Sequence, residues 1–206
     1  MGNEPGRNEQ YVSRETQGRL DMLEGLVKKW NPTINLVSKD SINNLRHRHI
    51  DDSLQIFDLA DHESGLWCDL GSGGGFPGLV VAILAADNSR AIRLELVESD
   101  GRKCAFLREA IRQLEVDASV VHSRIEDLPK RSAAVLSARA LAPLSKLCEF
   151  AHQHLSPEGI ALFPKGSSHQ DEIAAARKIW SFDLQLHPSK TDERAAILAL
   201  RNINRA

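Results

Sequence analysis

Cysteine, aromatic residues and long apolar runs are all scarce in this 206-residue sequence. The three cysteines, Cys68, Cys104 and Cys148, are odd in number and far apart, without the C-x-x-C spacing of many metal sites. They argue against structural zinc and against a disulfide framework, and they indicate a reducing compartment. No apolar run reaches the roughly 18 residues that a membrane-spanning helix needs. Aromatic residues make up only 5% of the chain, so few side chains can stack on bases.

A targeting signal and an excess of one charge are also missing. The segment up to Arg19 is polar and charged, so we expect no signal peptide and a cytoplasmic protein. The formal net charge is only −2, so any nucleic-acid site must be a local basic patch. The hydrophobic share of 42% supports a buried core, and the length predicts a single domain.

Within that domain the sequence predicts three parts. Residues 1–12 should lack stable structure, 13–62 should form an N-terminal helical cap, and 63–206 should form an α/β core. In the cap, apolar residues at three- and four-residue spacing predict a helix over 13–30, which Asn31-Pro32 should stop. Further helices are expected from Ser41 and over about 50–60.

Beyond the cap, segments of strand character alternate with helical stripes. Strands are expected at 66–70, 92–98, 118–121, 133–137, 159–163, 182–186 and 195–200, and helices at 79–86, 101–114, 143–154 and 168–180. This alternation predicts a mostly parallel sheet of seven strands that is covered on both faces. Because no helix separates the last two strands, they should form an antiparallel hairpin at one edge. That ending is more typical of methyltransferases that use S-adenosylmethionine (SAM) than of NAD-binding folds.

The stretch from Leu66 to Gly78 organises the rest of the chain. Its apolar strand ends in Asp69, and five glycines follow within the eight residues 71–78. Glycines let backbone N–H groups approach a ligand, and a helix that begins near Pro77 would favour an anionic group. We therefore predict a cofactor loop at the carboxyl end of a parallel strand. The alternative, a glycine-rich turn without a ligand, would order a flexible segment for little gain in packing.

The identity of the cofactor follows less directly from this loop. Residues 73–78 match G-x-G-x-x-G, which is a weak dinucleotide signal when it stands alone. An acid at the strand end followed by G-x-G, as in Asp69 with residues 71–73, is more typical of SAM sites. Glu98 ends the next strand and can accept hydrogen bonds from the ribose hydroxyls that SAM and NAD share. An NAD(P)-dependent oxidoreductase therefore stays open as an alternative.

Several segments, taken in order, resemble the RsmG (GidB) family. They are Trp30-Asn31 with Ile34-Asn35-Leu36, Arg48-His49-Ile50 with Asp52-Ser53, Asp69 to Gly78, Ser123 to Glu126, Ser137 to Ala140, and Lys165-Gly166. Two positions depart mildly from the family: Phe76, where Leu is commoner, and Glu98, where Asp is commoner. The resemblance implies a Rossmann-like class I SAM-dependent methyltransferase fold. It also implies methylation of N7 of a guanine in a loop of 16S ribosomal RNA.

The candidate site residues fall into two sets. The cofactor set is Asp69, Gly71, Gly73, Phe76, Glu98, Ile125, Glu126 and Arg139, and the substrate set is Arg48, His49, Asp52 and Lys165. The resemblance places Ile125 and Glu126 at the adenine and Arg139 in the SAM site. Purely structural roles, as a cap, a salt bridge or solvated surface, are the alternative for Glu98, Glu126, Arg139 and the group Arg48, His49 and Asp52. We expect no metal, and no general base, because the N7 lone pair can attack a methyl group without losing a proton.

The expected partner is 16S rRNA, as free RNA, within the 30S subunit or in an assembly intermediate. We expect a monomer that does not bind membranes. Two further alternatives remain, a small-molecule methyltransferase and a non-catalytic module that binds RNA or the ribosome. Methyl incorporation into 16S rRNA separates the enzyme from the binding module.

The cofactor prediction can be tested by thermal unfolding. SAM and its demethylated product should raise the melting temperature and NAD should not, because a ligand that binds only the folded state stabilises it. Gly73→Val should abolish the shift by placing a branched side chain where the backbone meets the ligand. Stabilisation by NAD without stabilisation by SAM would contradict the prediction.

Overall fold

The computed structural model describes residues 12–62 and 64–206. Of the segment 1–12, which was expected to lack stable structure, all but Val12 lies outside the described residues. The elements are α1 (Arg14–Ile34), η1 (Ile42–Asn44), η2 (Arg46–Asp51), α2 (Asp52–Leu59), β1 (Ser64–Leu70), α3 (Gly78–Asp87), β2 (Ala91–Glu98), α4 (Gly101–Leu114), β3 (Ala118–His122), η3 (Ile125–Asp127), β4 (Ala133–Ser137), α5 (Leu144–His154), β5 (Leu155–Lys165), α6 (His169–Ala176), β6 (Trp180–Pro188) and β7 (Ala196–Arg205).

One sheet of seven strands organises the described chain, in the order β3-β2-β1-β4-β5-β7-β6. Strands β1 to β5 pair in parallel, whereas β7 runs antiparallel to both β5 and β6. The predicted mostly parallel sheet with an antiparallel edge hairpin is therefore confirmed. The chain order reverses between β1 and β4, which is where open α/β sheets bind ligands at the carboxyl ends of their strands.

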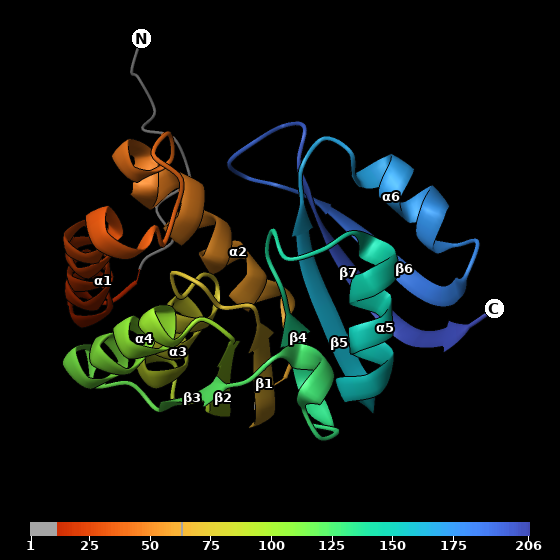
Figure 1. Cartoon of the computed structure of the whole chain (residues 1–206), viewed down its shortest axis with the longest axis horizontal. Coiled ribbons are helices and arrows are strands. Elements are labelled where there is room, and N and C mark those ends of the chain that lie inside the picture. Colours follow the sequence, from red (N-terminus) through yellow and green to blue (C-terminus); the bar gives the residue numbers. More distant parts are fainter. Residues whose placement is uncertain (1–11, 63) are drawn as a thin grey trace, which may run out of the picture.

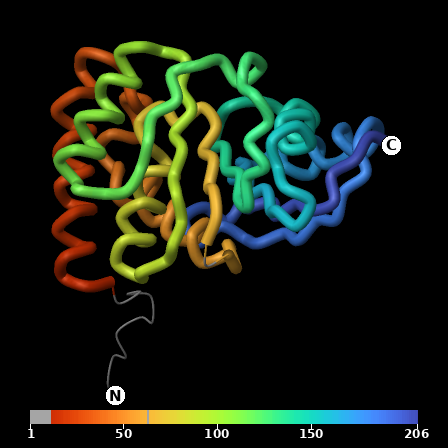
Figure 2. Tube along the Cα trace, turned by 90° about the horizontal axis from the view of Figure 1, so that it is seen from below, coloured from red at the N-terminus to blue at the C-terminus, as the bar shows by residue number. Residues whose placement is uncertain are grey.

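Helices cover the sheet on two faces (Figure 1). Helices α1 to α4 bury one hydrophobic cluster against the sheet, which includes Leu23, Val80 and Phe106. Helices α5 and α6 bury a second cluster on the other face, which includes Leu147 and Phe163. Helix α1 and the C-terminal hairpin lie at opposite ends of the molecule (Figure 2).

Helix α1 begins as predicted and ends later than predicted. Ser13 caps it, because its Oγ accepts a hydrogen bond from the Thr16 N–H at 3.1 Å. The helix continues through Pro32 to Ile34, so the predicted stop at Asn31-Pro32 is wrong. The final turn is held by the burial of Asn31 and Ile34 and is closed by Asn35 in the left-handed conformation, φ 48°. These contacts outweigh the intrahelical hydrogen bond that a proline cannot donate.

The rest of the cap also departs from the predicted boundaries. The helix expected from Ser41 is only a 3₁₀ turn at Ile42–Asn44. The helix expected over about 50–60 is present as α2, and the π-helix η2 runs directly into its start. Such π segments occur often at functional sites, and η2 carries Arg48 and His49. Near the other end of the chain, α6 stops at Ala176, before the predicted 180, because the buried Trp180 already begins β6.

Two helical glycines give a matched test of packing. A Cβ at Gly78, the first residue of α3, would overlap Cδ2 of Leu96 and lie 2.8 Å from Oδ2 of Asp69, whereas a Cβ at Gly25 in α1 would meet nothing within 4 Å. Gly78→Ala should lower the free energy of unfolding by about 1–3 kcal/mol through overpacking. Gly25→Ala should raise it by about 0.5–1 kcal/mol, because alanine loses less entropy in a helix. Urea unfolding measures both, and equal effects would contradict this account of the packing.

Candidate active site

A cavity of about 670 Å³ lies along the carboxyl edge of the sheet. The glycine loop after β1 and the segments after β4 and β5 form its floor. The cap and the connection between β6 and β7 complete its walls. Its size falls within the range of small-molecule sites.

A buried carboxylate, that of Asp69, fixes the two ends of the glycine loop. Asp69 is 1% exposed; its Oδ1 accepts a hydrogen bond from the Ser137 hydroxyl at 2.7 Å, and its Oδ2 accepts one from the Gly78 N–H at 3.3 Å. The Ser137 Oγ in turn accepts a hydrogen bond from Nε1 of the buried Trp67 at 2.9 Å. Burial raises the pKa of Asp69 to about 6, although these hydrogen bonds oppose the shift. Asp69 thus links β1, β4 and the start of α3.

Glu98 holds the same loop from its other side. Its Oε2 accepts a hydrogen bond from the Gly73 N–H at 2.9 Å, and its Oε1 accepts hydrogen bonds from the N–H groups of Ser99 and Asp100 at 2.7 and 2.8 Å. The loop itself uses positive φ at Gly71 and Gly73, 65° and 52°, which glycine adopts without strain. The Glu98 carboxylate thus receives three backbone hydrogen bonds from the chain itself. Its predicted contact with ribose hydroxyls stays a prediction.

Arg139 joins the core to the cap. Its guanidinium donates to the backbone oxygen of Arg48 at 3.1 Å and to Nδ1 of His49, and it lies over the ring of Phe76 at 5.5 Å. The His49 imidazole stacks on the Phe76 ring with the centroids 5.2 Å apart. Desolvation, together with the charges of Arg139 and Arg48, lowers the pKa of His49 to about 3, so His49 is neutral at pH 7.

The two basic substrate candidates, Lys165 and Arg48, differ in the exposure and pairing of their side chains. The Nζ of Lys165 lies 2.7 Å from Oε2 of Glu172 and 2.7 Å from the backbone oxygen of Ala142, and its side chain is 8% exposed. Arg48 instead exposes its side chain at the cavity. Of these two cations, Arg48 is the more accessible to a phosphate.

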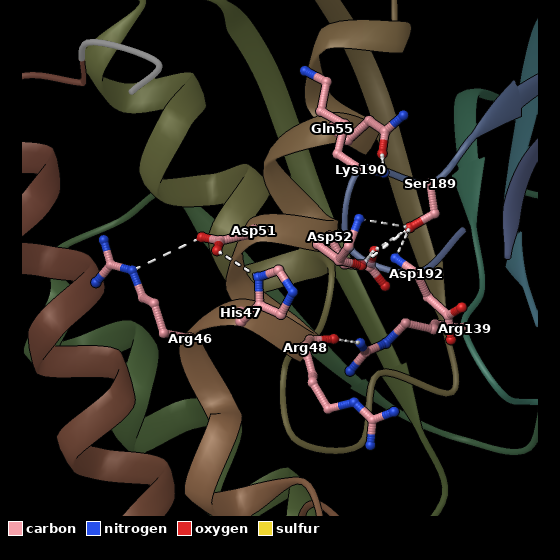
Figure 3. A network of polar contacts seen from close by, with 11 residues as sticks. Arg46, His47, Arg48, Asp51, Asp52, Gln55, Arg139, Ser189, Lys190 and Asp192 are labelled. Atoms are coloured by element: carbon pink, nitrogen blue, oxygen red, sulfur yellow. Dashed lines mark hydrogen bonds and ion pairs between the residues drawn. The ribbon is translucent and has the colours of Figure 1, made fainter. Parts of the chain in front are cut away.

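The connection between β6 and β7 is tied to the cap by two side chains of α2 (Figure 3). Oδ1 of Asp52 accepts hydrogen bonds from Ser189 Oγ at 3.2 Å and Thr191 Oγ1 at 2.6 Å. The amide of Gln55 donates to the Pro188 backbone oxygen at 2.7 Å and accepts from the Lys190 N–H at 3.0 Å. This loop therefore forms one wall of the cavity.

Most of the predicted site residues come together in this cavity. Among the described residues that line it are Gly71, Gly73, Phe76, Arg139, Arg48, His49, Asp52 and Lys165. Four predicted cofactor residues are not among the cavity-lining residues: Asp69, Glu98, Ile125 and Glu126. Asp69 and Glu98 lie behind the glycine loop, and Ile125 and Glu126 belong to η3 after β3, so the predicted adenine contact stays a prediction.

Several residues that line the cavity were not predicted from the sequence. They are Lys103 at the start of α4 and Ser189, Thr191 and Asp192 between β6 and β7. Lys103 lies beside Arg102 in a stretch predicted to be helical, and such a pair of basic residues is also common on solvated helix surface. The polar stretch 189–194 between two strands indicated a loop, but no local signal placed it beside the cap.

Residues 12–62 and 64–206 contain no group of three or more His, Cys, Asp or Glu side chains that could hold a metal ion. In the same part of the chain, no helix is long and apolar enough to cross a membrane.

Comparison with solved structures defines the class of the fold. The structure of M. jannaschii TYW2 in complex with AdoMet matches with a TM-score of 0.55 at 12% identity, covering 77% of this chain and 76% of that one. A TehB-like SAM-dependent methyltransferase from Corynebacterium glutamicum matches with a TM-score of 0.57 at 10% identity, covering 88% and 98%. The chain has the Rossmann-like α/β fold of class I SAM-dependent methyltransferases, as predicted.

Sequence comparison then defines the family. The family model described as GidB, rRNA small subunit methyltransferase G, matches residues 17–197, and the chain belongs to this family. A ribosomal RNA small subunit methyltransferase G from Ruegeria sp. (strain TM1040) is 50% identical over 205 residues, which cover all of both chains. Its counterpart from Paracoccus denitrificans is 50% identical over 196 residues, which cover 95% of this chain and 99% of that one. The predicted family, enzyme class and cofactor are thereby confirmed.

The buried carboxyl of Asp69 should leave a signature in the pH dependence of stability. Between about pH 4 and 6 it holds a proton in the folded protein but not in the unfolded chain, so its contribution to stability falls as the pH rises. In the wild type this decrease in the free energy of unfolding amounts to about 3 kcal/mol, because the pKa shift is about two units. The Asp69→Asn side chain cannot titrate, so the variant should lack this decrease. Urea unfolding at pH 4 to 7 measures the difference between the two proteins. A difference that does not change with pH would contradict the raised pKa.

Proposed function

We propose that this protein transfers the methyl group of SAM to N7 of a guanine in 16S rRNA. The observation that carries the proposal is one continuous cavity. The glycine loop after β1 lies on its floor, and the cap side chains Arg48, His49 and Asp52 lie on its wall. Cofactor and base can therefore meet in one site, and we propose that cap and core act as one domain.

The loop and Arg139 suit the cofactor. The guanidinium of Arg139 lies in the cavity and donates to a backbone oxygen and to His49 rather than to a carboxylate of the described chain. Its positive charge can therefore bind the carboxylate of the methionine moiety. Gly71 and Gly73 line the same cavity and have no side chain, so their backbone groups can contact the cofactor directly. Phe76 adds an aromatic ring to this part of the cavity. When bound, SAM supplies an electrophilic methyl group.

The chain needs to position the guanine and need not deprotonate it. The N7 lone pair lies outside the π system of the ring, so no general base is required. His49 is suited to orientation, because its Nδ1 already accepts a hydrogen bond from Arg139. Holding N7 in line with the methyl group can by itself contribute several powers of ten in rate.

The RNA contacts are expected at the cavity mouth. Arg48 and Lys103 both line the cavity, and their cationic side chains can bind backbone phosphates. Lys165 remains a candidate, although its charge is balanced by Glu172. The target guanine must leave the RNA stack to enter such a cavity. We propose a cytoplasmic monomer that acts on 16S rRNA, the 30S subunit or an assembly intermediate.

Two other functions lack a comparable observation. A small-molecule methyltransferase would not need the cations at the mouth, and a non-catalytic RNA-binding module would not need a cofactor floor open to the cavity. Methylation of 16S rRNA by the purified protein, with the product nucleoside identified by mass spectrometry, separates the proposed function from both alternatives.

The mechanism predicts a flat pH profile. In single-turnover experiments at saturating SAM and RNA, the rate should stay nearly constant from about pH 6.5 to 8.5, because no base with a pKa near 6.5 takes part. His49→Asn can slow the reaction by disturbing the contact with Arg139, but it should not change the slope. A rate that rises about tenfold per pH unit, and loses that slope in His49→Asn, would point to a target that must shed a proton.

A further inference from the structure

Asp52 differs from the other carboxylates that line the cavity. Among the described residues these are Asp52, Glu172 and Asp192. Glu172 pairs with Lys165 at 2.7 Å and Asp192 with Arg194 at 3.3 Å. Within the described chain, Asp52 forms no such ion pair and accepts hydrogen bonds only from hydroxyl groups. Arg139 is close enough to attract it, but the hydrogen bonds of that guanidinium go to Arg48 and His49.

The two oxygens of Asp52 have different surroundings. Oδ1 accepts hydrogen bonds from both Ser189 and Thr191, which fixes the side chain between α2 and the loop that connects β6 to β7 (Figure 3). Oδ2 has no hydrogen-bond partner in the part of the chain that the structure describes. A fixed carboxylate with one free oxygen at a cavity wall is a preorganised acceptor, so little entropy is lost when a donor binds.

The proposed substrate offers a donor for this acceptor. Guanine carries an amino group on C2, at the far end of the purine from N7. When N7 faces the glycine loop, this amino group points away from the loop. A carboxylate oxygen accepts from an amino group with a charge-assisted hydrogen bond. Adenine has no amino group at C2.

We propose that Oδ2 of Asp52 accepts a hydrogen bond from the N2 amino group of the target guanine and so selects guanine. This inference rests on the proposed function and names the contact by which the cavity would recognise guanine. Ser189 and Thr191 are then positioning residues, because they orient the carboxylate through Oδ1.

Gln55 supplies a matched control. It lies one turn further along α2 and ties the same loop through Pro188 and Lys190. It is 6% exposed and is not among the residues that line the cavity. Gln55→Ala therefore weakens the attachment of the loop without removing an acceptor from the cavity.

The experiment compares RNA that carries guanosine at the target position with RNA that carries inosine there. Inosine keeps N7, O6 and the N1–H group but lacks the N2 amino group. The wild type should methylate guanosine about 10–100-fold faster than inosine, the scale of one hydrogen bond to a charged group. Asp52→Asn keeps Oδ1 for the two hydroxyls and replaces Oδ2 by a donor. It should slow methylation of guanosine by the same factor and leave that of inosine within about twofold.

The control and the binding measurement make the test decisive. Gln55→Ala should slow both RNAs equally and keep the preference for guanosine. Equal slowing of both RNAs by Asp52→Asn would overturn the proposal and leave Asp52 a loop anchor. Weaker SAM binding by this variant in calorimetry would assign Asp52 to the cofactor ammonium group instead. If the wild type fails to methylate the guanosine RNA, the proposed function itself is wrong, which is a distinct result.

Discussion

The arrangement of the site depends on one buried carboxylate, that of Asp69. Placing a carboxyl group in the core costs free energy, as its raised pKa shows, and hydrogen bonds from Ser137 and Gly78 offset part of that cost. In return the carboxyl fixes the end of β1 against β4 and sets where α3 begins. The glycine loop between these elements is thereby fixed at both ends. Glu98 fixes its middle by accepting a hydrogen bond from the Gly73 N–H. Without this anchor, a segment so rich in glycine would sample many conformations.

A second constraint joins distant parts of the chain around the cavity. Arg139 from the core and Asp52 from the cap each contact an element far away in the sequence, η2 and the connection between β6 and β7. The cap is thereby a wall of the cavity, rather than an appendage to the sheet. The glycine loop and the cap side chains that line the cavity are consequently fixed relative to each other, as the proposed in-line methyl transfer requires.

Local patterns predicted the features that depend on neighbours in sequence. Alternation and helical stripes predicted the seven strands and four core helices, and the glycine spacing predicted the loop after β1. The boundaries failed where tertiary contacts outweighed local preference. The burial of Asn31 and Ile34 stabilises the last turn of α1, so the helix continues past Pro32. The π-helix η2 has no signal in the sequence. The contact of Asp52 with Thr191 spans 139 residues, so no spacing rule could have found it. The pairing of Lys165 with Glu172 was missed because Lys165 was considered only as a ligand for RNA.

The central claim is that this chain methylates N7 of one guanine in 16S rRNA. The most direct test maps N7-methylguanine in 16S rRNA from cells that lack this protein, beside cells that carry it and cells complemented with the Gly73→Val variant. The account predicts that one N7-methylguanine disappears in its absence, returns with the wild-type chain and fails to return with the variant. An unchanged set of N7-methylguanines in the cells that lack the protein would contradict it.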